Sequence, residues 1–263
     1  MNHPLTSLRR LRRALLACGM VLAAAPVLAD TIDFESHTNL VSPVLSAGDT
    51  AYAGRDQFAV GAYVASVADS VYAQSLPDYE PGAAGVIVDH SDRLACNIVT
   101  CPGSFFNSTH YYAGLNDSSV TLARADGKAF SLSSLDFAFV APMYDLPNLS
   151  YGQLVLSATV AGAASPVTRS LNFPGQFLDG NFVFDTWTLD SSFAGLQITS
   201  LNISACAFDA AMNCLNGADS YGLAQFAIDN VMLSAVPEPQ TWAMLAAGAA
   251  LLGARRRRQG EPA

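Results

Sequence analysis

The chain has 263 residues, of which 51% are hydrophobic, and its formal net charge is −9. Eight of its 13 Lys and Arg residues lie in two arginine clusters near the ends, whereas 20 of its 22 Asp and Glu residues lie between residues 30 and 236. This central region therefore carries a net charge of −15, which repels phosphate backbones and argues against nucleic-acid binding.

The N-terminal segment has the three parts of a secretory signal peptide. Four arginines lie between residues 9 and 13, an apolar run covers residues 14–28, and Ala29 precedes Asp30. We therefore predict that residues 1–29 are a signal peptide that is removed by cleavage before Asp30. An uncleaved N-terminal membrane anchor is the alternative.

Residues 30–235 consist of short β-prone segments separated by Gly, Asp, Asn, Ser and Pro. In the segment 135–140, for example, Leu135, Phe137 and Phe139 alternate with other residues and share one face. About ten such segments, without an amphipathic helix of useful length, predict an all-β ectodomain folded as a single β-sandwich or jelly roll. The expected strands are 31–34, 58–64, 85–89, 119–124, 130–140, 153–160, 167–173, 182–189, 196–207 and 225–234.

Four cysteines lie in this ectodomain, because Cys18 belongs to the predicted signal peptide. They form two close pairs in the sequence, Cys96 with Cys101 and Cys206 with Cys214. An even number of cysteines at short spacing in an exported chain predicts two disulfides. Neither pair has the CxxC spacing of zinc ribbons, and two pairs of free thiols are the alternative.

Aromatic residues follow the first cysteine pair, at Phe105, Phe106, Tyr111 and Tyr112. Exposed rings there could stack on sugars. Burial in the core is the commoner position for Phe and Tyr in a β-sandwich, so both interpretations stay open.

The C-terminal segment is apolar and then basic. Residues 240–254 would form a helix of about 22 Å, at about 1.5 Å per residue, which is shorter than the roughly 30 Å hydrocarbon core of a bilayer. The arginine cluster at 255–258 favours the cytoplasmic side and leaves the preceding chain outside. We therefore predict a short transmembrane helix that anchors the protein transiently in the inner membrane.

A proline-rich hinge, Pro237, Glu238 and Pro239, precedes this helix. The order of Pro-Glu-Pro, short apolar helix and arginine cluster resembles the PEP-CTERM sorting tail, whose carriers are exported by bacteria that make exopolysaccharide. The resemblance implies that residues 236–263 are a sorting tail and that an exosortase, a membrane transpeptidase, is a partner. It also implies that the three hinge residues are recognised as substrate and that the protein reaches the cell surface or the extracellular matrix. An ordinary single-span anchor is the alternative.

The ectodomain resembles a group of uncharacterised PEP-CTERM proteins, through the stretches 32–35, 111–117, 134–140 and 225–231. Its opening Asp-Phe-Glu and closing Phe-Ala-Ile-Asp-Asn-Val also resemble jelly-roll adhesion and carbohydrate-binding modules. In several of those modules, carboxylates of the first and last strands share a structural calcium ion. The resemblance implies a calcium site formed by Asp33, Glu35 and Asp229, because calcium takes six to eight oxygen ligands. The alternative is that backbone donors hold these carboxylates.

Motifs of the common catalytic sites do not occur in the sequence: there is no Gly-x-Ser-x-Gly elbow, no His-Glu-x-x-His and no phosphate loop. We assign no catalytic residue and expect a protein that is not an enzyme. The leading functional prediction is a structural or binding component of the extracellular polysaccharide layer. A lectin-like carbohydrate-binding module and a secreted hydrolase are the alternatives.

Overall fold

The structure is a computed structural model of the chain, and it describes residues 29–43, 45–47, 49–89, 96, 100–102, 109–143, 145–178, 180–215, 222–236 and 248. The predicted signal peptide before Ala29 and the sorting tail after Val236, Gly248 excepted, lie outside the described residues. Within the described part, no helix is both long enough and apolar enough to cross a membrane.

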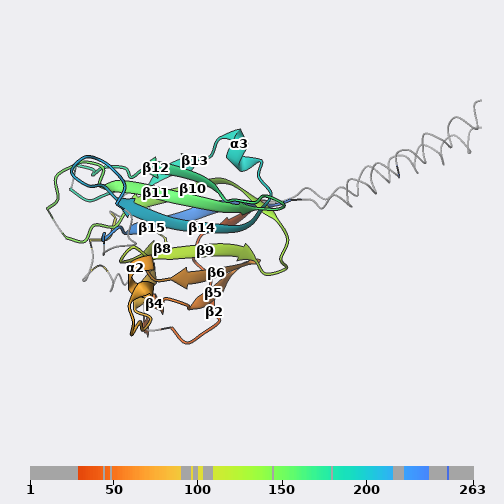
Figure 1. Cartoon of the computed structure of the whole chain (residues 1–263), viewed down its shortest axis with the longest axis horizontal. Coiled ribbons are helices and arrows are strands. Elements are labelled where there is room, and N and C mark those ends of the chain that lie inside the picture. Colours follow the sequence, from red (N-terminus) through yellow and green to blue (C-terminus); the bar gives the residue numbers. More distant parts are fainter. Residues whose placement is uncertain are drawn as a thin grey trace, which may run out of the picture.

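The described chain is almost entirely antiparallel β-structure, with two short helices (Figure 1). In chain order the elements are β1 (Ala29–Ile32), β2 (Thr38–Asn39), β3 (Leu45–Ala47), β4 (Asp49–Ala53), β5 (Gln57–Val60), β6 (Tyr63–Ala68), α2 (Val71–Ser75), β7 (Ala83–Val88), β8 (Tyr111–Gly114), β9 (Ser119–Arg124), β10 (Phe130–Phe139), β11 (Gly152–Val160), β12 (Val167–Asn172), β13 (Asp185–Thr188), α3 (Ser191–Ala194), β14 (Ile198–Ala207) and β15 (Phe226–Ala235).

The strands form two antiparallel layers. One layer has the order β12-β11-β14-β9-β6-β5-β2, and the other has the order β13-β10-β15-β8-β7-β4-β3. β1 extends the second layer by pairing with β15 next to β8. The two layers are joined where Phe130 of β10 pairs with Ile198 of β14. This arrangement confirms the predicted all-β, sandwich-like fold class.

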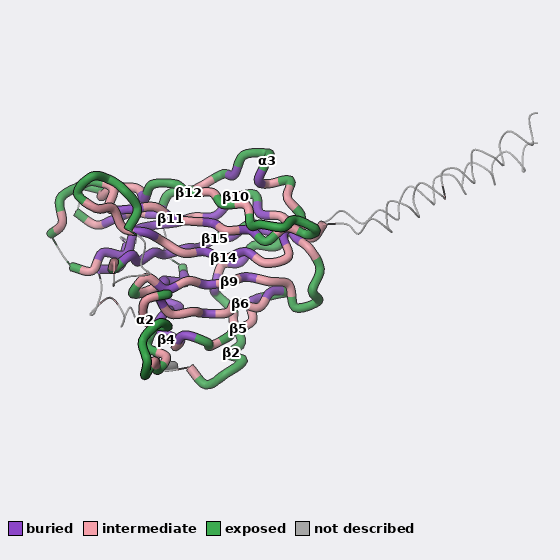
Figure 2. The backbone as a smooth tube through the Cα atoms, viewed as in Figure 1, coloured by how far each residue is buried: buried purple, intermediate pink, exposed green. Residues whose placement is uncertain are grey.

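The core lies between the layers, and the buried residues run along the strands in Figure 2. Phe58 of β5 stacks on Tyr52 of β4 across the layers, with 4.6 Å between ring centroids, and lies 5.9 Å from Tyr112 of β8. Tyr63 of β6 meets the ring of Phe130 edge to face at 5.5 Å. All five side chains are buried, so removal of their apolar surface from water stabilises the contact between the layers.

The second layer is buried on both faces over part of its area. Its outer face carries a second apolar cluster, which Cys101 and Phe184 cover from neighbouring loops. The other residues of this cluster lie on β7, β8, β10 and β15 or directly after β10: Val86, Val88, Tyr111, Ala113, Ala138, Val140 and Ala227. Because both faces are buried here, residues 84–88 and 137–141 are continuously apolar instead of alternating.

The prediction of one continuous strand over residues 58–64 is wrong. The chain forms the hairpin of β5 and β6 there, with Val60 opposite Tyr63 and the turn at residues 61 and 62. Gly61 has φ of +56°, a left-handed conformation that favours glycine and suits a two-residue hairpin turn. The short strands β2, β3, β4 and β8 were not expected at all.

The aromatic residues Tyr111 and Tyr112 belong to the core. Tyr112 is 0% exposed and points into the main core, whereas Tyr111 is 2% exposed and belongs to the outer cluster. Their burial decides the open question for these two rings in favour of packing. Phe105 and Phe106 lie outside the described residues.

The register of the strands gives the sandwich two distinct poles. At the terminal pole, β1 begins and β15 ends, with Ala29 opposite Ser234 and Ala235 opposite Phe130. At the distal pole, Phe226 of β15 lies opposite Phe139. The segments that follow β6, β8, β10, β12 and β14 turn at the distal pole, including α2 at the left of Figure 1.

Candidate functional site

A cleft of about 370 Å³ opens at the distal pole. Three segments far apart in the sequence form it: the connection from β6 to β7, the turn after β8 and the segment before β15. The lining residues are Asp69, Ser70, Ala73, Glu80, Gly82, Ala83, Asn116 and Leu223. Two of these residues are acidic and none is basic.

One wall of the cleft is fixed by the carboxylate of Asp69. Its Oδ2 accepts hydrogen bonds from the Tyr79 hydroxyl at 2.5 Å and from the backbone N–H of Gly82 at 3.1 Å. A Cβ atom on Gly54 would lie 2.3 Å from the same oxygen, so this approach requires glycine. Burial and the hydrogen bond to Asp69 raise the pKa of Tyr79 to about 12, so its hydroxyl remains a donor at neutral pH.

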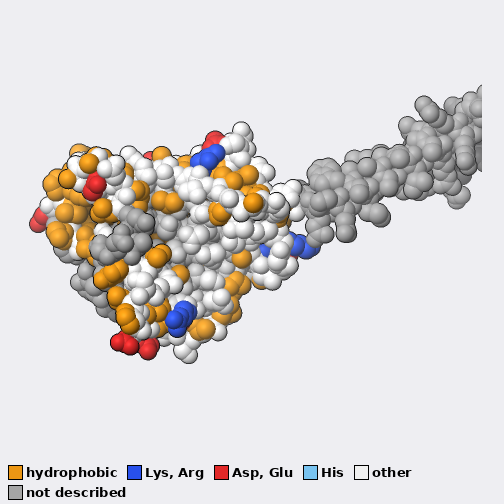
Figure 3. Space-filling view, viewed as in Figure 1, with side chains coloured by type: hydrophobic (Ala, Val, Ile, Leu, Met, Phe, Trp, Pro, Cys, Tyr) orange, Lys and Arg blue, Asp and Glu red, His pale blue; other side chains and the backbone are white. Residues whose placement is uncertain are grey.

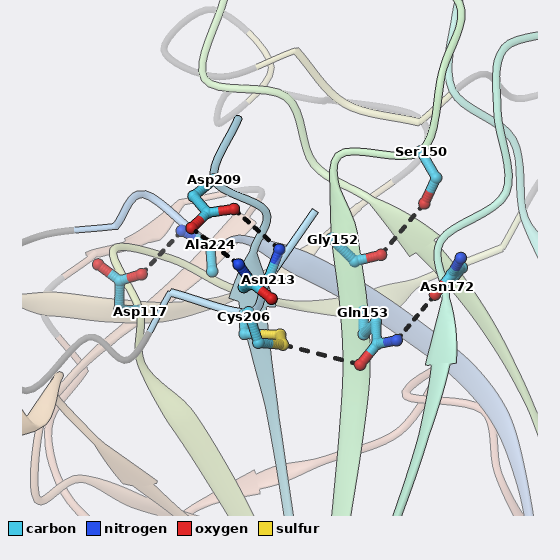
Figure 4. Close-up of a disulfide and its surroundings, with 10 residues drawn as sticks. Asp117, Ser150, Gly152, Gln153, Asn172, Cys206, Asp209, Asn213 and Ala224 are labelled. Carbon is cyan, nitrogen blue, oxygen red and sulfur yellow. Dashed lines mark hydrogen bonds between the residues drawn. A yellow bond between two sulfur atoms is a disulfide. The ribbon is translucent and has the colours of Figure 1, made fainter. Parts of the chain in front are cut away.

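The opposite wall is fixed by the carboxylate of Asp117. It accepts hydrogen bonds from three successive backbone N–H groups, those of Gly222 at 2.7 Å, Leu223 at 3.0 Å and Ala224 at 2.8 Å. The bond to Ala224 is visible in Figure 4. Asn116 and Asp117 have φ of +56° and +60°, a region that Asn and Asp tolerate better than most residues. The turn after β8 is thus clamped to the segment that leads into β15.

Two polar side chains of the cleft are exposed, those of Glu80 and Asn116. Neither has a hydrogen-bond partner among the described residues. Together with the remaining lone pairs of Asp69, they offer acceptors and one amide donor to a molecule in the cleft.

The first and last strands lie side by side, as the predicted calcium site requires, with Ile32 opposite Val231. Asp33, just beyond β1, accepts the backbone N–H of Glu35 at 3.2 Å. Glu35 accepts the backbone N–H of His110 at 2.8 Å, and its other oxygen lies 2.7 Å from Nδ1 of the same histidine.

The third predicted ligand, Asp229, is 0% exposed. It accepts the backbone N–H of Asn230 at 2.7 Å and the hydroxyl of Thr109 at 3.0 Å. All three carboxylates therefore accept a backbone N–H, as the alternative interpretation expects. No group of three metal-ligating side chains occurs within the ranges that the structure describes. The calcium site stays a prediction.

Chelation of calcium tests this prediction. We expect EDTA to lower the melting temperature of the purified protein and millimolar calcium to restore it. An ion that binds only the native state stabilises that state by about 2.7 kcal/mol at 100-fold excess over the dissociation constant. Asp229→Asn should weaken the response, whereas Asp145→Asn, at an exposed turn, should not. A melting temperature indifferent to EDTA would leave three carboxylates held by protein donors alone.

The chain enters and leaves the ectodomain on neighbouring strands of the terminal pole. Asp30, the predicted first residue after cleavage, lies opposite Leu233. β15 ends at Ala235, and the hinge residues Pro237, Glu238 and Pro239 follow outside the described part. A family model for the PEP-CTERM protein-sorting motif matches residues 235–258.

The chain carries a PEP-CTERM sorting motif. The match begins at the last residue of β15, so the sorting motif starts where the folded domain ends. It includes the Pro-Glu-Pro hinge, the apolar run and the arginine cluster, which confirms the resemblance of the tail. The motif identifies an exported protein, and it is the recognition signal for exosortase processing.

One of the solved structures to which the chain is similar comes from Clostridium thermocellum. That structure contains the CBM22-1 and GH10 modules of the N-terminal endo-1,4-beta-D-xylanase 10B of Clostridium thermocellum, complexed with xylohexaose. The identity is 11% and the TM-score is 0.30, and the match covers 80% of this chain and 28% of that chain. A comparison with curated proteins gives no match.

Both cysteine pairs of the sorting-motif protein form the predicted disulfides. Cys96 and Cys101 have Cα atoms 5.2 Å apart, and Cys206 and Cys214 have Cα atoms 5.4 Å apart. Both separations lie in the range that a disulfide requires. The second disulfide closes the loop after β14 at the distal pole, with Sγ of Cys214 3.7 Å from Oε1 of Gln153 (Figure 4). The first lies beside the outer apolar cluster.

Sequence reasoning did not single out the cleft residues Asp69, Glu80 and Asn116 or the clamp residue Asp117. Consecutive Asn and Asp residues after an apolar strand are typical of a turn, so the sequence does indicate a turn at this position. The partners of Asp117 lie more than 100 residues further along the chain, and no local pattern indicates them.

Proposed function

We propose that this protein is a non-enzymatic component of the bacterial surface or extracellular matrix, delivered by exosortase processing and associated with the polysaccharide layer. The observation that carries the proposal is the position of the sorting motif, which begins directly at the end of β15. A processing enzyme at the membrane can therefore act on the hinge without unfolding the domain.

The arrangement of the chain ends supports the same proposal. β1 and β15 pair at the terminal pole, so the predicted signal peptide and the sorting tail both leave the domain there. Membrane segments at either end would place this pole next to the bilayer. The distal pole and its cleft would then be directed away from the membrane, towards extracellular material.

The charge of the ectodomain is compatible with an extracellular location within a hydrated polymer. Its net charge of −15 keeps the domain soluble, and it opposes association with phosphate-rich surfaces. The disulfides stabilise it in an oxidising compartment, where such bonds persist. A lectin-like activity is the second candidate, which the cleft at the distal pole favours.

Intact-mass spectrometry tests the processing. In a host with an exosortase, we expect the surface-released protein to begin at Asp30 and to lack the arginine cluster at 255–258. Deletion of the exosortase, or Glu238→Ala in the hinge, should leave the tail in place and the protein in the membrane fraction. Glu261→Ala, beyond the matched motif, is the matched control and should be processed normally. A released protein whose mass includes residues 255–258 contradicts the proposal.

A further inference from the structure

The cleft at the distal pole has the dimensions of a small-ligand site. Its volume of about 370 Å³ lies at the lower end of the roughly 300–1,000 Å³ that pockets for small molecules occupy. A volume of this size accommodates one or two sugar rings. A ligand that fills the cleft would be a small molecule or a short section of a polymer.

The polar groups of the cleft select for hydroxyl groups. Carboxylate oxygens of Asp69 and Glu80 accept hydrogen bonds, and the Asn116 carboxamide both donates and accepts. Ser70 is 2% exposed and accepts the N–H of Ala73 at 3.1 Å, so its own hydroxyl proton is available as a donor. A vicinal diol of a sugar offers both donors and acceptors to such a set.

The charge of the residues that line the cleft disfavours anions. None of its eight lining residues is basic, and the ectodomain around it is strongly acidic. A phosphate, a sulfate or a uronic acid would be repelled by Asp69 and Glu80 at close range. Ala73, Ala83 and Leu223 add apolar surface, against which the C–H face of a neutral sugar ring can pack.

The two walls are rigid before any ligand binds. Asp69 is tied to Tyr79 and Gly82, and Asp117 is tied to residues 222–224. The Asp69 carboxylate closes the β6–β7 connection on itself, and the Asp117 carboxylate joins the turn after β8 to the segment before β15. A preorganised cleft loses less conformational entropy on binding, which favours recognition of a small neutral ligand.

From these observations we infer that the cleft binds a neutral sugar unit of an extracellular polysaccharide. Asp69, Glu80 and Asn116 hold its hydroxyl groups, and Leu223 packs against its ring. The inference rests on the proposed function, because a polysaccharide ligand requires export. It adds to that function a site and a ligand class. The cleft also lies about 34 Å from the terminal pole, at about 3.4 Å for each of the ten residues of β15, so the membrane-side end does not obstruct a polymer.

A glycan array and calorimetry test the inference with the mature protein, purified after processing. We expect binding to one or more neutral oligosaccharides and none to uronic-acid or sulfated glycans. The neutral glycan that binds is then titrated by calorimetry. Glu80→Ala and Asn116→Gly should each weaken its affinity at least tenfold. Glycine is chosen at 116 because it keeps the φ of +56° accessible while removing the side chain.

Control measurements distinguish a loss of glycan affinity from a loss of folded protein. Both cleft residues are exposed, so the melting temperatures of the two variants should match that of the wild type. Asp78→Asn, an exposed carboxylate outside the lining, should leave the affinity unchanged.

Three results would overturn the sugar site: no binding to any neutral glycan at millimolar concentration, binding that survives both cleft variants, or binding of spermidine instead of glycans. In each case a correctly processed mass would leave the proposed export standing. A tail that is not processed, combined with glycan binding to the cleft, would overturn the export proposal and keep the site.

Discussion

Replacement of Phe58 by alanine is expected to lower the free energy of unfolding by about 3–5 kcal/mol. The side chain is 0% exposed and connects the two layers, because its ring touches those of Tyr52 and Tyr112 in the opposite layer and lies 6.5 Å from that of Phe34. Alanine would leave a cavity that three aromatic neighbours cannot fill without leaving their own positions.

Urea unfolding of the purified protein, followed by tryptophan fluorescence, measures this change. Leu178→Ala is the control, since Leu178 is 95% exposed in the loop after β12 and should alter the free energy by no more than about 0.5 kcal/mol. Phe58→Leu keeps part of the side-chain volume, so its loss of free energy of unfolding should lie between those of Phe58→Ala and Leu178→Ala. This variant still tests the prediction if Phe58→Ala does not fold. An equal loss of free energy of unfolding in Phe58→Ala and Leu178→Ala would show that the contact between the layers is not stabilised by the Phe58 ring.

Asp117→Ala is expected to lower the free energy of unfolding by about 2 kcal/mol or more and also to abolish glycan binding. The substitution removes the acceptor of three backbone N–H groups at once, and hydrogen bonds to a charged group contribute about 1.5–3 kcal/mol each. Without the clamp, Leu223 and its neighbours lose their fixed position on the wall of the cleft.

The variant Asp117→Asn distinguishes the contributions of the two carboxylate oxygens. Oδ2 accepts from Gly222 and Leu223, whereas Oδ1 accepts from Ala224, and an amide can supply an acceptor to one of these sets only. We therefore expect an intermediate loss of stability in urea and an intermediate loss of affinity in calorimetry. Asp78→Asn serves again as the control. Wild-type stability and affinity in Asp117→Ala would mean that the clamp holds neither the fold nor the cleft.

The fold class could be predicted because a half-buried strand leaves a local pattern. β9 occupies residues 119–124 as expected, and β10 ends one residue earlier than expected. The hairpin at Gly61 was missed because its two strands are apolar on both sides of a turn that contains no polar residue. β8 was missed because its four residues are buried on both faces and show no alternation.

The candidate site could be predicted only in part, for a related physical reason. Disulfides between cysteines five or eight residues apart are local, so the spacing in the sequence was sufficient. The carboxylates Asp33, Glu35 and Asp229 were singled out on the basis of resemblance, and the adjacency of their strands is confirmed. Asp69 and Asp117 were not predicted to fix the cleft, because this role depends on their partners, and the backbone N–H groups that bind Asp117 carry no sequence signature.

The pairing of β15 determines how the protein bears a mechanical load. β15 joins the segment at the cleft, residues 222–224, directly to the sorting tail, and it is paired with β10 on one side and with β1 and β8 on the other. A pull on a tail still in the membrane, against a polymer held at the cleft by the β6–β7 connection and the turn after β8, loads β15 along its length. Antiparallel hydrogen bonds lie perpendicular to the strand, so such a pull shears both rows of bonds together. A tail attached to an edge strand and pulled sideways would instead peel its bonds apart one pair at a time.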